Sequence, residues 1–382
     1  MSVNNNDPYW PRSDEIIGSP PETPYKNSVG TTRESIAQVT SNKAQGSIEL
    51  PSRYSKIHSG KVRDTYDYPG NPDYQIIVAT DRVSTHDVVH KTAIPNKWVV
   101  LTQMSKFWFD LLKNDPRTSD IKTHLPDVPM ELPDDFPPEH RERAMIVKKL
   151  IPLPVEAIVR GYLYGSVMKK SDNPDEQGEY TRYWTVAGIT VRQWMKKVGK
   201  FDEPIFSPST KGAAGEHDVN MTWGLNQMIE HLKNWECPKT IPGVTEDRDG
   251  KNKLSDAKAE EYAKHMQEKS ILLYQVAQEH AQKRGITLGD TKFEWWLDGE
   301  GNVVLIDEVL TPDSSRYWES DTVIEWQEPK SFDKEEIRAH VMRQWKTSWQ
   351  EKEKPSLELP PEVVAAAQTR YLDIQDRLTR AA

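Results

Sequence analysis

The stretch GDTKFEWWLDGEGNVVLIDEVLTPDSSRYW, residues 289–318, reads as two β-strands joined by a tight turn at DGEG. Charged residues occur along both strands and at the exit of the hairpin, among them Asp290, Lys292, Glu294, Asp307, Glu308 and Arg316. Residues two apart on a strand share a face, so the first three charges lie on one side of the sheet. Because burying charged groups is costly, the hairpin is the first candidate for a functional site.

The pairing of the two strands decides which charges meet. If the turn pairs Leu297 with Asn302, Lys292 lies opposite Asp307, and a slip of one residue brings the following glutamate there instead. Mg²⁺ is held in proteins by one or two carboxylates together with nucleotide phosphates. Glu294 and Asp307 fit that requirement, with Lys292 as a partner for phosphate. A solvated edge hairpin that carries surface ion pairs fits the same spacing, and both interpretations stay open.

The totals describe a polar protein that is large enough for two or three domains. The chain has 382 residues and a net charge of −9, and its mean hydropathy is −0.76. The negative charge argues against nucleic acid as a partner, although a local arginine cluster still binds anionic small molecules. The single cysteine, Cys237, excludes an internal disulfide framework and a cysteine-based zinc site.

No apolar run approaches the roughly 18 residues of a membrane helix, so we expect no membrane partner. The N-terminal MSVNNNDPYWPRSDE has neither the basic nor the apolar region of a signal peptide. The sequence therefore predicts a cytoplasmic enzyme.

Composition and periodicity divide the chain into an N-terminal tail or arm, a first ordered lobe, a second lobe and a helical C-terminal segment, over residues 1–50, 51–150, 151–330 and 331–382. QIIVAT predicts a buried strand, and LTQMSKFWFDLL predicts an amphipathic helix. The clearest helix covers residues 256–284 and ends at Gly285. Strands and helices in this mixture favour an α+β fold over a regular βαβ alternation.

Two further stretches carry charges beside glycine. In SGKVRDTYD, Gly60 lets backbone N–H groups approach a phosphate, while Lys61 and Arg63 supply charge, but an ordinary hairpin turn has the same pattern. In VEAIVRGYLYGS, Glu156 and Arg160 share a strand face. They form either a structural ion pair or part of a site in which Arg160 binds a phosphate, with Arg316 as its partner.

The polar loop PIFSPSTKGAAGEHDVN is either functional or a mobile surface loop. His217 in this loop has no second histidine at ligand spacing, so no transition-metal site is predicted there. The chain also lacks the Gly-x-Ser-x-Gly, HExxH and His-Arg-Asp motifs of hydrolases, zinc proteases and protein kinases.

Seven stretches together resemble one family, the phosphoribosylaminoimidazole-succinocarboxamide synthases (SAICAR synthetases) of purine biosynthesis. They occur in the order of that family and are SGKVRDTYD, ATDRVSTHDVV, LTQMSKFWF, LPVEAIVRGYLYGS, PIFSPSTKGAAGEHDVN, DTKFE and LIDEVLTPDSSRYW. The resemblance implies a carbon–nitrogen ligase that uses ATP to join L-aspartate to the carboxylate of 5-amino-1-(5-phospho-D-ribosyl)imidazole-4-carboxylate (CAIR). The products are SAICAR, ADP and phosphate, formed through an acyl phosphate.

The same resemblance implies a two-lobed fold, with a kinase-like nucleotide-binding lobe, an ATP-grasp-like second lobe and a helical C-terminal part. It implies ATP and Mg²⁺ as cofactors, small-molecule partners, and a monomer or homodimer. The catalytic residues that it implies are Lys292, Glu294 and Asp307, the last two as metal ligands. The ATP-binding residues that it implies are Gly60, Lys61, Arg63, Val147, Lys148 and Lys149. The substrate-side residues that it implies are Asp81, Arg82, Ser84, Asp87, Glu156, Arg160, Ser166, Ser209, Lys211, His217, Asp218 and Arg316.

Three departures from the family pattern are visible. Trp98 in IPNKW and Trp296 in FEWW stand where glycine is usual, Trp295 replaces a phenylalanine, and Tyr164 in LYGS replaces a smaller residue. Packing outside the site explains these changes, and so does a reshaped pocket in a paralogue that joins another amine or azole carboxylate. A small-molecule kinase and an inactive binding protein are the alternatives from other classes.

Overall fold

The computed structural model describes residues 46–169, 185–191, 195–211, 219–239, 241–348 and 353–380. These residues belong to one compact unit, Ser41–Arg380. None of the helices in these ranges combines the length and the apolar character that crossing a membrane requires.

A four-stranded antiparallel sheet comes first along the chain, with strand order β1-β2-β3-β6. Its strands are β1 (Lys56–Ser59), β2 (Arg63–Asp67), β3 (Tyr74–Ala79) and β6 (Ala144–Lys148). Buried Tyr66, Ile76 and Val78 form one cluster on this sheet together with Ile48. The Tyr66 hydroxyl donates to the Ile48 carbonyl oxygen at 2.6 Å, so packing against this sheet already begins within the segment that was expected to be a tail.

The larger sheet has six strands, and β7 and β14 run through its centre. Its path is β10-β7-β14-β15, and β11 pairs with β7 while β16 pairs with β14. The strands are β7 (Ile151–Tyr162), β10 (Lys200–Phe206), β11 (Ser209–Thr210), β14 (Ile286–Leu297), β15 (Val303–Ile306) and β16 (Ser315–Glu319). Every neighbouring pair is antiparallel.

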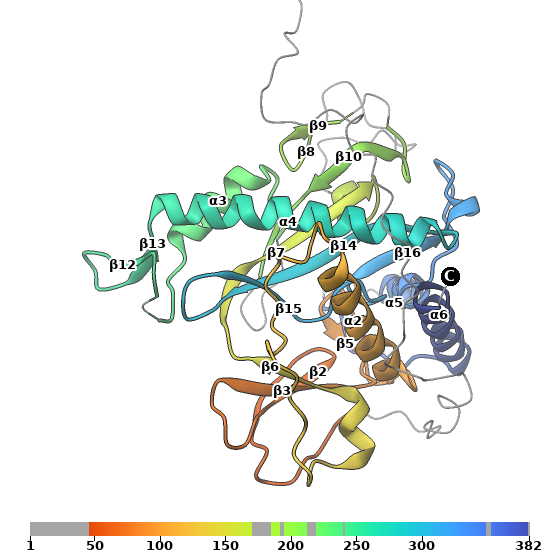
Figure 1. Cartoon of the computed structure of the whole chain (residues 1–382). Coiled ribbons are helices and arrows are strands. Elements are labelled where there is room, and N and C mark those ends of the chain that lie inside the picture. Colours follow the sequence, from red (N-terminus) through yellow and green to blue (C-terminus); the bar gives the residue numbers. More distant parts are fainter. Residues whose placement is uncertain are drawn as a thin grey trace, which may run out of the picture. The chain divides into compact units, whose positions relative to one another are not determined.

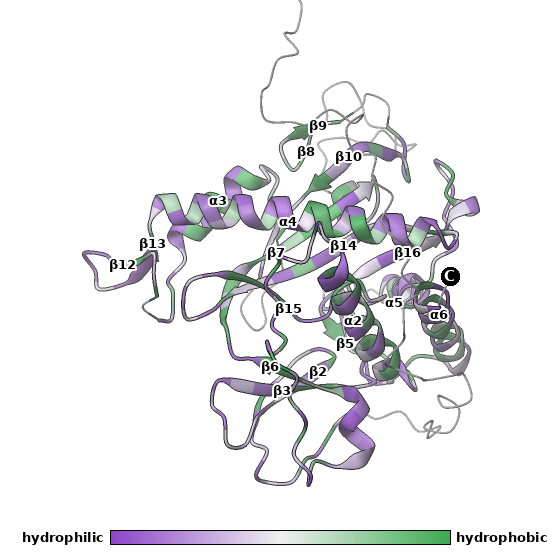
Figure 2. Ribbon diagram, in the orientation of Figure 1, coloured by the Kyte–Doolittle hydropathy of each residue, from purple (hydrophilic) through white to green (hydrophobic). Residues whose placement is uncertain are grey.

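The long helix α4 (Asp256–Gln282) lies across one face of this sheet (Figure 1). Its Ser255 N-cap accepts a hydrogen bond from the Lys258 N–H, and Gly285 beyond its end has a φ of 69°, a value that glycine adopts without strain. Figure 2 shows hydrophobic and hydrophilic residues interspersed along α4, as one buried face requires. The Trp295 indole donates to the Ser270 hydroxyl of α4 at 3.0 Å. Phe293, Trp295 and Leu297 therefore face the core that α4 helps to form, and Lys292 and Glu294 face the other way. Ile286 and Leu288 join the same core because β14 is irregular between Leu288 and Asp290.

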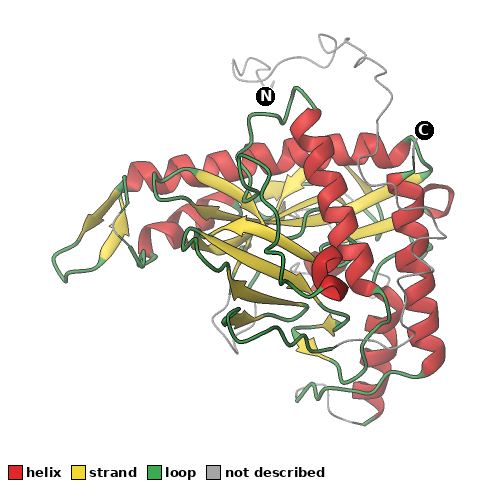
Figure 3. Cartoon of the chain, turned by 60° about the horizontal axis from the view of Figure 1, so that its bottom comes forward, coloured by secondary structure: helices red, strands yellow, loops and turns green. Residues whose placement is uncertain are grey.

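The remaining elements surround this core, with helices and strands mixed rather than strictly alternating (Figure 3). The other helices are α2 (Lys97–Asn114), α3 (Leu225–Asn234), α5 (Glu335–Thr347) and α6 (Pro361–Thr379), with short 3₁₀ turns at Pro138–Arg143, Gly165–Lys169 and Ser320–Thr322. The small two-stranded sheets pair β4 (Ser84–Thr85) with β5 (Val88–Val89), β8 (Thr185–Val186) with β9 (Ile189–Thr190), and β12 (Val244–Glu246) with β13 (Asn252–Leu254). The α+β fold class is confirmed.

The register of the hairpin differs from the first expectation. Leu297 pairs with Val303, not with Asn302, which is the one-residue slip that the sequence left open, and the connection is a five-residue loop. Asp298 causes the difference, because its carboxylate accepts from the backbone N–H of Glu300 at 3.0 Å and of Asn302 at 2.8 Å. The strand β15 ends at Ile306, before any residue stands opposite Lys292.

The predicted segments map onto separate sheets. The four-stranded sheet lies within residues 51–150, the six-stranded sheet lies within 151–330, and α5 and α6 lie within 331–382. Residues 1–45 fall outside the described residues. The exact lobe boundaries stay a prediction.

Candidate active site

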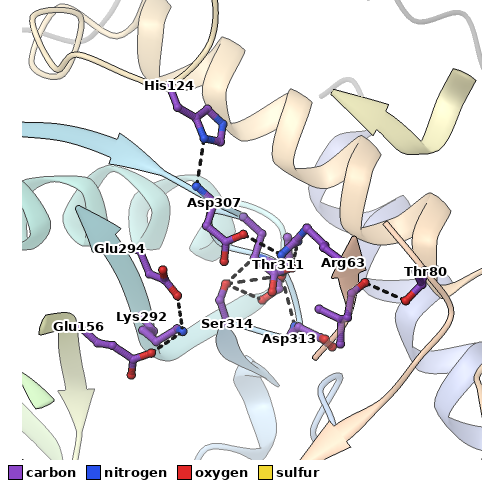
Figure 4. A network of polar contacts seen from close by, with 12 residues as sticks. Arg63, Thr80, His124, Glu156, Lys292, Glu294, Asp307, Thr311, Asp313 and Ser314 are labelled. Atoms are coloured by element: carbon purple, nitrogen blue, oxygen red, sulfur yellow. Dashed lines mark hydrogen bonds and ion pairs between the residues drawn. The ribbon is translucent and has the colours of Figure 1, made fainter. Parts of the chain in front are cut away.

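A lysine lies between two carboxylates on the open face of the six-stranded sheet. Glu294 of β14 stands directly opposite Glu156 of β7. The Lys292 amine donates to Glu156 at 2.7 Å and to Glu294 at 2.9 Å (Figure 4). Carboxylates opposite each other on paired strands repel, so Lys292 offsets a repulsion that the register itself creates.

A second lysine reaches the same cluster from the segment after β11. The Lys211 amine donates to the other oxygen of Glu294 and lies 5.4 Å from the ring centroid of Trp296. The Ser209 hydroxyl donates to Glu156 at 3.2 Å. Ser209 and Lys211 therefore lie in the same cluster as Lys292 and Glu294; their role on the substrate side stays a prediction.

The charges of this cluster stabilise one another. Burial disfavours the ammonium of Lys292, but the carboxylates of Glu294 and Glu156 outweigh it and raise the Lys292 pKa well above its ordinary value. Burial likewise disfavours the Glu294 carboxylate, yet Lys292 and Lys211 lower its pKa. Both groups are thus charged at neutral pH.

Asp307 follows β15 with a φ of 63°, a left-handed value that is uncommon outside glycine. Its backbone N–H donates to Nδ1 of His124 at 3.1 Å, and Nη1 of Arg63 donates to its carboxylate at 2.9 Å (Figure 4). The other end of the guanidinium pairs with Glu308 at 2.5 Å. Burial raises the pKa of Asp307 to about 6, Arg63 opposes that rise, and the neighbouring Glu294 and Glu308 add to it.

These side chains suit a divalent cation bound together with phosphates. Within the described ranges, no group of three or more His, Cys, Asp or Glu residues forms a complete metal cage. Glu294 and Asp307 carry hard carboxylate oxygens of the kind that Mg²⁺ takes, one or two at a time, when phosphates complete its shell. Lys292, Lys211 and Arg63 carry the positive charges that such phosphates would need.

Two arginines meet at the other end of the same sheet face. Arg160 of β7 donates to Asp290 at 2.6 Å, and Arg316 of β16 donates to the same oxygen at 2.5 Å. The remaining nitrogens of Arg160 donate to the Ser207 hydroxyl at 2.8 Å and to the Ser166 hydroxyl at 3.1 Å. Burial lowers the pKa of Arg160 to about 10, which leaves it charged at neutral pH.

Glu156 and Arg160 do not form the ion pair with each other that was one of the two alternatives. Each has a different partner, Lys292 for Glu156 and Asp290 for Arg160. The physical reason is register, since each residue meets a countercharge on β14 rather than its neighbour four positions along β7. Arg160 and Arg316 share the Asp290 carboxylate, and the expectation that they bind a phosphate together stays a prediction.

The turn at Gly60 lies between β1 and β2, as expected, but its residues have separate partners. Lys61 pairs with Asp87 at 2.5 Å. Arg82 donates to the Gly60 carbonyl oxygen at 2.9 Å and pairs with Asp64 at 2.7 Å, which braces the turn. These contacts give Arg82 a structural role in the structure described here.

Other predicted residues lie apart from the carboxylate cluster. Ser84 is a buried residue of β4, and Asp81 accepts a hydrogen bond from the Trp98 N–H at 3.3 Å. Val147 is buried in β6. Lys148, at its end, pairs with the exposed Asp127, and Lys149 pairs with the half-buried Asp67, each at 2.7 Å. His217 and Asp218 lie outside the described residues.

Three residues that were assigned no role belong to the site by geometry. Asp290 joins the two arginines, Ser207 orients Arg160, and His124 holds the backbone of Asp307. Asp290 had a signal in the sequence, because it shares a strand face with Lys292. His124 had none, since it is 183 residues from Asp307.

Comparison with known proteins gives one answer. The family model described as SAICAR synthetase matches residues 56–356. A phosphoribosylaminoimidazole-succinocarboxamide synthase from Schizosaccharomyces pombe is 37% identical over 331 residues, which cover 86% of this chain and 96% of the relative. The enzyme of the same name from Pasteurella multocida is 37% identical over 325 residues, which cover 85% of this chain and 98% of the relative.

The fold agrees with these sequence matches. The solved SAICAR synthase from Saccharomyces cerevisiae, in complex with SAICAR, has a TM-score of 0.66 and 29% identity, and the match covers 88% of this chain and 98% of that one. A SAICAR synthetase solved in complex with ADP has a TM-score of 0.52 and 20% identity, over 87% of this chain and 99% of that one, and it supports the fold alone. The family match, the near-complete coverage and the shared fold together show that this chain belongs to the SAICAR synthetase family.

Proposed function

We propose that this chain is a carbon–nitrogen ligase that joins L-aspartate to the carboxylate of CAIR at the expense of ATP. The products are SAICAR, ADP and phosphate, and the reaction belongs to de novo purine biosynthesis. ATP and Mg²⁺ are the proposed cofactors and small molecules the proposed partners. We place the enzyme in the cytoplasm, as a monomer or a homodimer, on the family resemblance.

One observation carries the proposal. A single sheet face holds two charged centres, Lys292 with its carboxylates and the Arg160–Arg316 pair. On β7 the first centre is marked by Glu156 and the second by Arg160. These residues are four positions apart, which is about 13 Å at the usual rise of a strand. That separation suits one extended ribonucleotide, with its phosphate at the arginines and its carboxylate beside the ATP phosphates.

The chain's residues fit the needs of this chemistry. A carboxylate is a poor electrophile, so it must be activated as an acyl phosphate before an amine can displace phosphate. Mg²⁺-bound ATP supplies the phosphoryl group for that activation. Lys292, Lys211 and Arg63 are placed to stabilise negative charge on phosphoryl oxygens, and Glu294 and Asp307 to ligate the cation. No described side chain is assigned as a covalent nucleophile, because positioning and charge supply most of such catalysis.

The arginine pair serves the other substrate. Its guanidinium groups are placed to bind the ribotide phosphate in the bidentate manner that lysine cannot reproduce. Ser166 and Ser207 orient Arg160, whereas Glu156 belongs to the lysine cluster. We assign Ser209 and Lys211 to the substrate side of the same cluster.

The proposal is tested by measuring ADP release with CAIR and each of a panel of amino acids. We expect release that depends on both CAIR and an amine, with aspartate as the best amine and SAICAR as the product. A paralogue would prefer another amine. A small-molecule kinase would release ADP with CAIR alone and yield a phosphorylated product, and an inactive binding protein would release none.

A further inference from the structure

Asp290 occupies the middle of the arginine pair. On the central strand β14 it stands opposite Arg160 of β7 in one register and opposite Arg316 of β16 in the other. Both guanidinium groups donate to the same carboxylate oxygen, Oδ2, at 2.6 Å and 2.5 Å. Asp290 is only 6% exposed, so a single buried carboxylate fixes two cations from two different strands.

Each arginine is oriented further by its own neighbours. Arg160 gives its other donors to the Ser207 and Ser166 hydroxyls, as described above. Arg316 lies over the ring of Tyr164, with 5.3 Å between its guanidinium carbon and the ring centroid. Its Nε is buried and has no hydrogen-bond partner in the described part of the chain. A buried donor without a partner is costly, which indicates that Arg316 is arranged for an acceptor that arrives with a ligand.

Two guanidinium groups held this close repel each other, and without a shared counter-charge they would move apart. The carboxylate removes that repulsion, but it also subtracts one positive charge from a site that must attract a phosphate. A site selected only for positive charge would not contain it. The arrangement therefore fixes the positions of the two arginines at the expense of one unit of positive charge in the site.

We propose that Asp290 is a positioning residue of the phosphate site. It touches the two arginines, not the substrate, and holds them at the spacing that receives the ribotide phosphate. This inference rests on the proposed function and deepens it. It assigns to Asp290 the alignment of the Arg160–Arg316 pair, which selects a phosphorylated substrate.

The alternative role of Asp290 is charge cancellation for folding alone, and the two roles predict opposite outcomes. If Asp290 only cancels charge, replacing it with asparagine makes the site more positive and anion binding stronger or unchanged. If Asp290 positions the arginines, the same replacement weakens phosphate binding although the site gains positive charge.

The experiment compares the wild-type chain with Asp290→Asn and Asp290→Glu. Glutamate keeps the charge but moves the carboxylate along its side chain. Steady-state kinetics give KM separately for CAIR and ATP, and calorimetry gives the affinity for ribose 5-phosphate without ATP. We expect both variants to raise KM for CAIR by about 10-fold or more, to weaken ribose 5-phosphate binding similarly, and to leave KM for ATP within about 2-fold.

Glu319→Gln is the matched control. Glu319, at the end of β16, is also a carboxylate paired with an arginine, Arg377 at 3.0 Å, but outside the proposed site, so its loss should leave all three constants unchanged. Unchanged or tighter ribose 5-phosphate binding in Asp290→Asn overturns the inference, as does an equal rise in both KM values. If Asp290→Asn does not fold, Asp290→Glu decides by the same criteria.

The calorimetric measurement separates this inference from the proposed function. A wild-type chain that binds ribose 5-phosphate in an Asp290-dependent way but does not ligate CAIR would contradict the proposed function and leave the positioning role standing. A wild-type chain that ligates CAIR while the Asp290 variants retain normal KM values would support the proposed function and contradict the positioning role.

Discussion

Arg63 of β2 and Asp307, which follows β15, form an ion pair of 2.9 Å that joins the four-stranded sheet to the end of the hairpin in the six-stranded sheet. Both side chains are mostly buried, and Arg63 also pairs with Glu308. The contact therefore ties a residue expected near the ATP phosphates to a residue expected to bind Mg²⁺. Several consequences of this arrangement can be measured.

Asp307→Asn and Glu294→Gln should abolish ligation and leave the fold intact. Asparagine tolerates the left-handed backbone of Asp307 and still accepts from Arg63, but it loses the charge that a cation needs. We expect kcat to fall by about 1,000-fold or more at saturating Mg²⁺, which corresponds to several kcal/mol. Circular dichroism and thermal unfolding check the fold. Glu300→Gln, at the exposed hairpin tip, is the control, and near-normal turnover in both site variants would remove the metal assignment.

Arg316→Lys should weaken binding of the ribotide far more than binding of ATP. Lysine keeps the positive charge but has no planar fork with which to contact Asp290 and a phosphate together. Losing one charge-assisted hydrogen bond costs roughly 1.5–3 kcal/mol, or about 10- to 150-fold in KM for CAIR. Arg160→Lys should behave similarly. Equal losses for both substrates would mean that the arginines do not form a phosphate clamp.

Trp296→Phe should alter stability but hardly alter the choice of amine. Trp296 stands opposite Val304 in the hairpin register, and its ring lies under the Lys211 amine, while its Nε1 has no hydrogen-bond partner among the described residues. Phenylalanine keeps a ring for that packing, so a stability loss of about 1 kcal/mol is expected. Competition between amines provides the measurement. A preference for some other amine over aspartate of about tenfold, or 1.4 kcal/mol, in the wild-type chain would instead support a reshaped pocket.

The stability of the fold should decrease as the pH falls from about 6.5 to about 4. Burial, with Arg63 and Lys148, lowers the pKa of His124 to about 3, and burial lowers that of His280 to about 4. Below about pH 6.5 the unfolded chain binds a proton on each of these histidines, and the folded chain does not. Each histidine therefore lowers the free energy of unfolding by about 1.4 kcal/mol for every pH unit of this fall.

Urea unfolding at a series of pH values tests this expectation. His124→Asn keeps an acceptor for the Asp307 N–H. It should reduce the slope of the unfolding free energy against pH by about 1.4 kcal/mol per pH unit, which corresponds to one proton. His58→Asn, at an exposed residue of β1, should leave the slope unchanged. Identical slopes in wild type and His124→Asn would show that this histidine is not buried in its neutral form.

Local patterns in the sequence were enough for several elements. The apolar spacing and the Gly285 terminus predict α4, and the alternation of charges predicts that Lys292 and Glu294 share a face. The exact register was not accessible in this way. It depends on Asp298 capping a five-residue loop, and the spacing of the turn residues does not reveal that contact.

Contacts between distant segments were the hardest to foresee. Arg63 and Asp307 are 244 residues apart, and no periodicity connects them. The partnership of Arg160 with Asp290 depends on strand order, since β7 and β14 are neighbours in the sheet although these two residues are 130 positions apart in the chain. Motif resemblance located many of the residues of these clusters, whereas the folded chain determines which residues meet.

The most direct test of the proposed ligation follows an oxygen atom. CAIR labelled with ¹⁸O in its carboxylate is incubated with the wild-type chain, ATP, Mg²⁺ and aspartate, and the released phosphate is analysed by mass spectrometry. Activation of the carboxylate as an acyl phosphate transfers one labelled oxygen to phosphate when the amine displaces it. We predict one ¹⁸O per phosphate together with SAICAR formation. Unlabelled phosphate, or a stable phosphorylated product without SAICAR, would contradict the account.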